Sequence, residues 1–185
     1  MSFVLDQLIS DCISAVGKPH TERAIRDIVA QAVSDPQALM KVLGVPSRAG
    51  VERLHVASDL TVLNVVWAPR MTLRPHNHNV WAVIGVYSGR EDNIFWRRRA
   101  DDPDGRIEAA GAKSIGPGEV CPLGRHIIHS VTNPTSQFTG AIHVYGGDFF
   151  TTERSEWEPD ALHEQPYNLE QNLQLFEDSN AMWTQ

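Results

Sequence analysis

Apolar residues recur at spacings of three and four through the first 45 residues, a periodicity that predicts helices. The stripe of the first helix comprises Val4, Leu5, Leu8, Ile9, Cys12, Ile13 and Val16. Residues 17–19, Gly-Lys-Pro, are expected to end it, and Thr21 to cap a second helix. The stripe of this second helix comprises Ile25, Ile28, Val29, Ala32 and Val33. Asp35 and Pro36 then mark the start of a third, short helix that ends near Leu43 and Gly44.

After residue 45 the pattern changes to short runs of valine, isoleucine and aromatic residues separated by Gly, Pro and Asn. The runs span 60–69, 80–89, 91–99 and 139–150, and they are typical of strands in a compact antiparallel sandwich or barrel. Residues 99–111 are polar and contain Asp104-Gly105, which predicts a loop. The tail from Trp157 has scattered prolines and acidic residues, and it is expected to pack over the barrel as irregular structure.

These patterns predict a single domain, which fits the length of 185 residues. Within it we expect a helical segment at 1–45, a β-barrel at 50–160 and a C-terminal extension at 161–185. Hydrophobic residues make up 42% of the chain and charged residues 21%, so its composition is globular rather than disordered. The net charge of −7 disfavours nucleic acid and anionic membranes as partners.

Two features favour a cytoplasmic location. The N-terminal residues lack a basic leader, with Asp6 and Asp11 interrupting the apolar positions, and no apolar run approaches the ~20 residues that span a bilayer.

Cys12 and Cys121 are the only cysteines, too few for a disulfide scaffold. Cys12 lies on an apolar helical stripe and is expected in the core, whereas Cys121 is expected in a loop.

Two of the eight histidines, His76 and His78, stand one residue apart, so an extended backbone points both rings to the same side of a sheet. On that side we also expect the small apolar residues Val80, Ala82, Ile84 and Val86. If the two rings bind a metal, a third ligand must come from elsewhere. The candidates are His126, His129 and His143. In an extended segment His126 and His129 face opposite ways, so they cannot both be inward ligands without a bulge.

Together these segments resemble the two motifs of the cupin superfamily, with His76-x-His78 in the first and His129 followed by Asn133 in the second. The first motif usually has a glutamate ligand five residues after its second histidine, where this chain has Val83. A cupin with three histidines and no glutamate resembles the thiol dioxygenases, of which cysteine dioxygenase is best known. The resemblance spans residues 45–160 and is carried by VVWAPRMTLRPHNHNVWAVIGVYSG (65–89), HIIHSVTN (126–133) and AIHVYGG (141–147).

The resemblance implies an all-β core behind N-terminal helices, a cupin double-stranded β-helix or jelly-roll barrel. It implies Fe(II) held by His76, His78 and His129, with His143 and Tyr145 as catalytic residues beside the metal. Three imidazoles also suit Zn, Ni and Cu. The implied partners are O2 and a small carboxylated thiol of the cysteine or 3-mercaptopropionate type, oxidised to its sulfinic acid. Arg53 and Arg154 are alternative ligands for the substrate carboxylate.

Two departures leave other functions open. The cysteine that crosslinks to the tyrosine in mammalian cysteine dioxygenases is missing around Trp81–Val83, and Ala141 replaces a serine of the family's tyrosine–histidine relay. The chain could therefore be a metal-binding cupin with other oxidative or isomerase chemistry, or a ligand-binding sensor without turnover.

Overall fold

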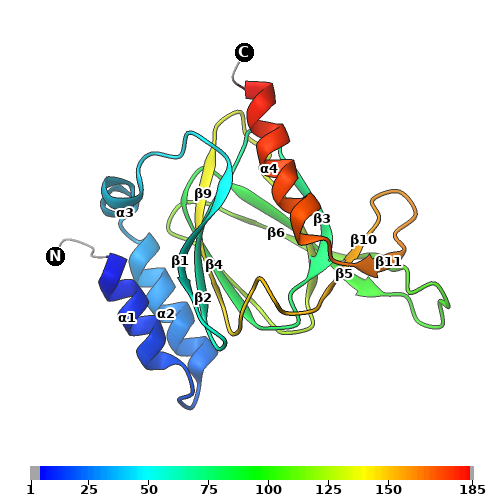
Figure 1. Cartoon of the computed structure of the whole chain (residues 1–185), viewed down its shortest axis with the longest axis horizontal. Coiled ribbons are helices and arrows are strands. Elements are labelled where there is room, and N and C mark those ends of the chain that lie inside the picture. Colours follow the sequence, from blue (N-terminus) through cyan, green and yellow to red (C-terminus); the bar gives the residue numbers. More distant parts are fainter. Residues whose placement is uncertain (1–4, 184–185) are drawn as a thin grey trace.

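The computed structural model describes residues 5–183 and begins with three helices (Figure 1). Their bounds are Leu5–Ala15 for α1, Thr21–Val33 for α2 and Pro36–Leu43 for α3. The predicted stripes of the first two helices are buried at Leu8, Cys12, Ile25, Val29 and Val33, whereas the predicted stripe residue Val4 lies outside the described residues. No helix within 5–183 combines the length and apolar character needed to cross a membrane.

The caps of α2 and α3 differ from each other. Asp35 caps α3 as predicted, because its carboxylate accepts a hydrogen bond from the backbone N–H of Ala38 at 3.0 Å. Thr21 is not the cap of α2: the capping position is His20, in the left-handed region and without a side-chain hydrogen bond. The Thr21 hydroxyl instead donates to the carbonyl of Lys18 at 2.7 Å and so closes the turn between α1 and α2.

Eleven strands form two antiparallel sheets among the described residues. The first sheet has the order β1 (Gly50–Val56), β2 (Thr61–Trp67), β9 (Thr139–Tyr145), β4 (Ala82–Ser88) and β7 (Val120–Leu123). The second has the order β11 (Glu164–Pro166), β10 (Ser155–Trp157), β3 (Thr72–Asn77), β8 (Ile128–Thr132), β5 (Glu91–Arg98) and β6 (Ile107–Ile115). From β2 to β5 and from β6 to β10 successive strands alternate between the sheets. The predicted fold class, an all-β double-stranded β-helix behind N-terminal helices, is confirmed.

Alternate residues of the first sheet face two separate cores. The predicted inward residues Val80, Ala82, Ile84 and Val86 all pack in the barrel interior. Val83 packs instead with α1 and α2, which lie on the outer face of this sheet (Figure 1). The expectation that Val83 occupies the place of the cupin glutamate is therefore wrong, because Ala82 is the residue that points inward.

Two segments predicted as irregular are regular. The loop expected at 99–111 ends at Arg106, because β6 begins at Ile107 and pairs with β5. In this edge strand only the terminal residues Ile107 and Ile115 are buried. The exposed residues between them are polar or small, a composition that resembles a loop. Cys121, expected in a loop, is buried within β7.

The tail also differs from the prediction. The second sheet continues to Pro166, beyond the barrel limit expected at residue 160, and Leu169–Trp183 form helix α4 rather than irregular structure. The buried residues of α4 are Asn172, Phe176 and Asn180, spaced four apart. Two of these three are polar, whereas the apolar cavity-lining residues of the helix are Leu169, Leu173 and Phe176, so its inner side mixes polar and apolar residues. Asn180 fastens α4 to the start of β1 through both the N–H and the carbonyl of Ala49, at 2.7 and 2.9 Å.

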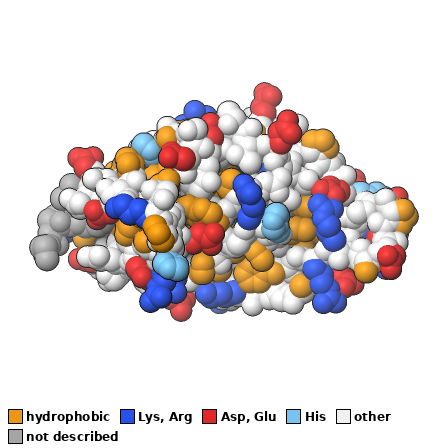
Figure 2. All heavy atoms as spheres, turned by 90° about the horizontal axis from the view of Figure 1, so that it is seen from below, with side chains coloured by type: hydrophobic (Ala, Val, Ile, Leu, Met, Phe, Trp, Pro, Cys, Tyr) orange, Lys and Arg blue, Asp and Glu red, His pale blue; other side chains and the backbone are white. Residues whose placement is uncertain are grey.

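Figure 2 shows one face of the molecule, on which acidic and basic side chains are interspersed with hydrophobic ones. The described residues of this face form no continuous basic area. The absence of nucleic-acid and membrane partners stays a prediction, since it rests on charge alone.

Close packing of α2 on β4 generates a stability prediction. A methyl group added at Gly85 would lie 2.5 Å from a Val29 methyl and 2.9 Å from a Val33 methyl, and valine side chains have little freedom to move aside. We expect Gly85→Ala to lower the free energy of unfolding by about 1–3 kcal/mol. Chemical denaturation measures the change. Gly111→Ala is the matched control, because a methyl group there meets nothing within 4 Å. Equal stability of the two variants would contradict the prediction.

Candidate metal centre

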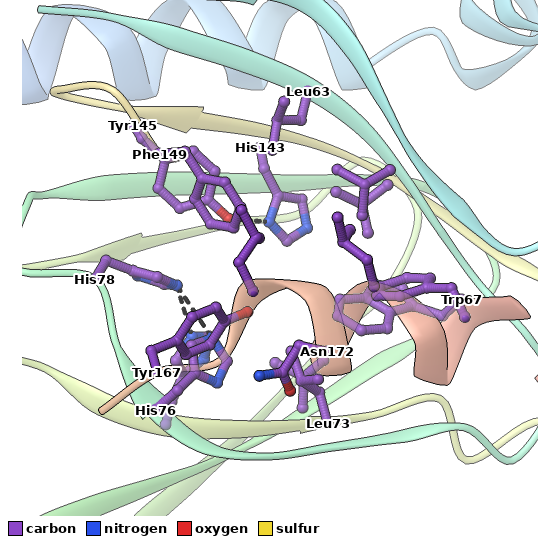
Figure 3. A pocket seen from close by; sticks show the side chains of 17 residues that line it. Leu63, Trp67, Leu73, His76, His78, His143, Tyr145, Phe149, Tyr167 and Asn172 are labelled. Atoms are coloured by element: carbon purple, nitrogen blue, oxygen red, sulfur yellow. Dashed lines mark hydrogen bonds between the residues drawn. The ribbon is translucent and has the colours of Figure 1, made fainter. Parts of the chain in front are cut away.

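Three imidazole rings converge inside the barrel at one end of β3 and β8. His76 lies on β3 directly opposite His129 on β8, and His78 follows β3 immediately. The Nε2 atom of His78 lies 3.2 Å from that of His76 and 3.4 Å from that of His129 (Figure 3 shows the first two rings). Two nitrogens that share a metal at about 2.1 Å lie about 3.0–3.4 Å apart. Two of the three nitrogen–nitrogen distances match this range, and all three nitrogens lie within 4.8 Å of one another, so the rings could hold a single transition-metal ion.

The three rings are neutral at pH 7 because burial in the barrel interior disfavours their charged form. Burial, partly offset by a hydrogen bond to the Arg74 carbonyl, lowers the pKa of His76 to about 4. Burial holds the pKa of His78 and of His129 well below the ordinary 6.5, and the neighbouring histidines lower both further. Neutral imidazole is the form that binds metals.

Hydrogen bonds to the other ring nitrogen fix the tautomer of two of these rings. The Nδ1–H of His76 donates to the backbone carbonyl of Arg74 at 2.9 Å. The Nδ1 of His129 lies 2.7 Å from the side-chain oxygen of Asn93, which accepts from it. In both rings Nε2 is therefore the unprotonated nitrogen, with its lone pair toward the cluster. Among the described residues, these three histidines form a group without a carboxylate. His126 is exposed and outside the group.

His143 and Tyr145 lie together on β9, on the barrel side of the first sheet. Both side chains are buried, and the Tyr145 hydroxyl lies 3.0 Å from the Nδ1 of His143 (Figure 3). The tyrosine ring packs edge-on against His78, with 5.0 Å between ring centroids. Burial raises the pKa of Tyr145 above its ordinary value, so the hydroxyl keeps its proton. The predicted pair is thus adjacent to the three histidines.

The two arginines proposed for substrate binding have different surroundings. Arg53 on β1 is exposed, and its guanidinium lies over the Phe150 ring at 3.8 Å, outside the lining of the central cavity. Arg154 is only 8% exposed, and its guanidinium lies against both Phe149 and Tyr167, at 4.2 and 4.0 Å from the ring centroids. Those two rings line the cavity.

Some of the N–H groups of the Arg154 guanidinium donate hydrogen bonds and others do not. Nη1 donates to the carbonyls of Phe149 and Thr152. Nε and Nη2 are buried without a hydrogen-bond partner. Buried N–H groups of a cation without acceptors are costly, so an acceptor supplied by a ligand would stabilise this arrangement.

The histidines face an enclosed cavity of about 30 Å³. Its remaining wall is largely apolar and includes Leu63, Leu73, Val131, Leu173 and Phe176. Tyr167 and Leu169, at the start of α4, line both this cavity and a wider cleft of about 980 Å³ outside it, which Arg154 also borders. Sequence reasoning did not identify this part of the site, because α4 was not predicted.

Two further polar residues behind the histidines also escaped prediction. Glu91 and Asn93 on β5 are buried at 0% and 1% exposure, and the sequence run that contains them was interpreted only as a strand. Their spacing of two residues puts them on one side of the strand, the same signal that singled out His76 and His78.

No protein-family model matches the sequence. Among solved structures, the chain is similar to a protein from Bacillus halodurans, with 15% identity over 55% of this chain and 72% of that one, at a TM-score of 0.46. An RmlC-like cupin family protein from Methanocaldococcus jannaschii shares 11% identity over 57% and 85% of the two chains, at a TM-score of 0.45. A variant of oxalate decarboxylase from Bacillus subtilis shares 14% identity over 55% of this chain but only 26% of its own, at a TM-score of 0.43.

Proposed function

We propose that this protein is an Fe(II)-dependent thiol dioxygenase that oxidises a small carboxylated thiol to its sulfinic acid. The observation that carries the proposal is the buried group of three neutral imidazoles, without a carboxylate among them, facing an enclosed cavity. The resemblance of the histidine and tyrosine motifs to the thiol dioxygenases supports it. The reaction RSH + O2 → RSO2H balances without a further reductant.

The ligand set explains why a thiol suits the site. Three neutral imidazoles leave the charge of a divalent ion uncompensated, so the site favours an anion, and a thiol there is favoured as its thiolate. When bound, Fe(II) supplies the binding and activation of O2. The largely apolar wall and the small volume of the cavity leave little room for water, which strengthens these electrostatic interactions.

Tyr145 and His143 act beside the three histidines. The Tyr145 hydroxyl lines the cavity, holds its proton and is oriented by the Nδ1 of His143. With its proton directed to that nitrogen, the tyrosine oxygen is positioned to accept a hydrogen bond from the S–H of the incoming thiol or from an N–H group of the substrate.

Arg154 is the residue that we assign to the substrate carboxylate. Nε and Nη2 form one edge of the guanidinium, the edge that binds a carboxylate through two parallel hydrogen bonds. These are the two nitrogens that lack a partner. Arg154 stacks on two rings that line the cavity, whereas the exposed Arg53 stacks on Phe150, which does not line it.

The metal site is tested first. We expect the purified protein to contain about one transition-metal ion per chain. His76→Ala, His78→Ala and His129→Ala should each remove most of it, because two imidazoles hold a divalent ion far more weakly than three. Metal analysis by mass spectrometry measures the content. A chelator should lower the melting temperature of the wild type and not that of these variants.

His126→Ala is the matched control, since His126 is exposed and lies on the same segment as His129. Metal content unchanged in His129→Ala, or lost in His126→Ala, would contradict the assignment.

The activity is tested with the Fe(II)-loaded protein, an oxygen electrode and four thiols: cysteine, 3-mercaptopropionate, cysteamine and mercaptosuccinate. We expect a carboxylated thiol to be oxidised fastest, with one O2 consumed for each sulfinate detected by mass spectrometry. Oxygen consumption without sulfinate would indicate a different reaction. No consumption despite full iron loading would favour a cupin with other chemistry or a sensor.

The role of Arg154 is tested by Arg154→Gln, with Arg53→Gln as its control. Loss of a bidentate, charge-assisted contact costs about 1.5–3 kcal/mol, so kcat/KM for a carboxylated thiol should fall about 10- to 100-fold. Metal content should not change. The control should keep its kcat/KM, and cysteamine, which has no carboxylate, should be affected little by either substitution. An equal loss in the control would return Arg53 to the site.

A further inference from the structure

Glu91 is a fully buried carboxylate that lies behind the three histidines. The reaction proposed above does not use this carboxylate. Its side chain comes from β5 and is 0% exposed. Oε1 accepts a hydrogen bond from Nδ2 of Asn93 at 3.1 Å, and Oε2 accepts one from Nε1 of Trp67 at 3.1 Å. Oε2 also lies 3.6 Å from Nε2 of His143. Burying a carboxylate costs free energy unless neighbouring groups stabilise its charge, and here three side chains surround it.

We propose that Glu91 is a positioning residue that sets the hydrogen-bond direction of His129 and of His143, and through them the donor and acceptor pattern of the cavity. The part that concerns His129 rests on the metal site proposed above. The part that concerns His143 does not.

The link to His129 passes through Asn93. Because Glu91 only accepts hydrogen bonds, it requires the NH2 end of the Asn93 amide to face it. The oxygen end then faces His129, where Nδ1 lies 2.7 Å away and must be the protonated nitrogen. Protonation at Nδ1 leaves the lone pair of Nε2 free to bind a metal. One carboxylate therefore orients a ligand that it does not touch.

The link to His143 is direct. Nε2 of His143 is buried and has no hydrogen-bond partner at normal distance, and the Glu91 oxygen lies 3.6 Å away. A shift of about 0.5 Å brings the pair to ordinary N–H···O distance. With its proton on Nε2, His143 accepts at Nδ1 from the Tyr145 hydroxyl, 3.0 Å away. The tyrosine oxygen then presents its lone pairs to the cavity, ready to accept from an S–H or N–H group.

Glutamine at position 91 has the same shape as glutamate, but it cannot accept hydrogen bonds from Asn93 on one side and from Trp67 and His143 on the other. In one orientation the glutamine oxygen faces Trp67 and His143, and the glutamine NH2 group then faces the NH2 group of Asn93. The Asn93 amide must rotate to avoid this clash of two donors, and it then presents its NH2 group to Nδ1 of His129. If its oxygen faces Asn93, its NH2 group opposes the N–H of Trp67 and requires an acceptor at Nε2 of His143. Either way the tautomer of one histidine is reversed.

The test compares wild type, Glu91→Gln and Asp92→Asn, a half-buried neighbour on the same strand that pairs with Arg90 and serves as control. Two-bond 1H–15N NMR on metal-free protein with labelled histidine reports which ring nitrogen carries the proton. We expect Nδ1–H for His129 and Nε2–H for His143 in wild type and control, with one of the two reversed in Glu91→Gln. Where His129 is the reversed ring, the variant should bind Zn²⁺ about 10- to 100-fold more weakly in a chelator competition; where His143 is reversed, Zn²⁺ affinity should stay close to that of the wild type.

Asn93→Leu is the second variant, in case Glu91→Gln does not fold. It cuts the link to His129 alone, so Zn²⁺ binding should weaken while His143 keeps its proton on Nε2. Unchanged tautomers and affinity in Glu91→Gln, or a wild-type His143 protonated at Nδ1, would overturn the proposal. A wild type that binds no Zn²⁺ would refute the metal site, while the tautomer of His143 would still decide the role of Glu91.

Discussion

The pairing of β3 with β8 is the constraint on which the site depends. Side chains alternate along a strand, so a slip of one residue in this pair would turn His76 or His129 out of the barrel. The register is held at its far end by a hydrogen bond between the hydroxyls of Thr72 and Thr132, at 3.0 Å. Just beyond, the Asn133 amide donates to the carbonyl of Ala68 at 2.9 Å and accepts from the N–H of Thr135 at 3.0 Å. The asparagine of the second motif therefore holds the end of the strand and not the metal.

Two buried carboxylates flank the histidines from opposite sides. Glu156 on β10 lies directly opposite His76 on β3, and it accepts hydrogen bonds from Gln165 at 2.8 Å and from the Asn172 amide of α4. Its nearest cation is Arg74, at 3.4 Å. Glu156 thus fastens the helix that covers the cavity, whereas Glu91 organises the polar groups behind it. Each carboxylate is expensive to bury, and each connects segments far apart in the sequence.

Much of the fold and the central part of the candidate site could be predicted from the sequence, because both depend on periodicity. The helical stripes and the two-residue spacing of His76 and His78 at the end of β3 are local properties of the backbone. Helix α4 escaped prediction because its buried side mixes Phe176, which packs against Trp67, with Asn172 and Asn180, which are held by hydrogen bonds.

The local sequence also does not indicate which of the two arginines lies against the rings that line the cavity. This difference depends on Arg154 stacking between rings from two segments, which spacing along the chain does not encode. The same holds for Glu91, whose carboxylate has the sequence signature of a surface residue and is enclosed only once Trp67, Asn93 and His143 surround it. In both cases a charged side chain acquires its role from partners distant in the sequence.

The small size of the cavity has a consequence for which molecules reach the histidines. A volume of about 30 Å³ holds about two water molecules, and access from the outer cleft passes Tyr167 and Leu169. A sulfur atom on a short chain needs only a small displacement of these side chains. A thiol borne by a peptide would require α4 to separate from Glu156 and from Ala49, which breaks buried hydrogen bonds. Under the function proposed above, the size of the cavity would therefore exclude bulky thiols before any chemical group on them is recognised.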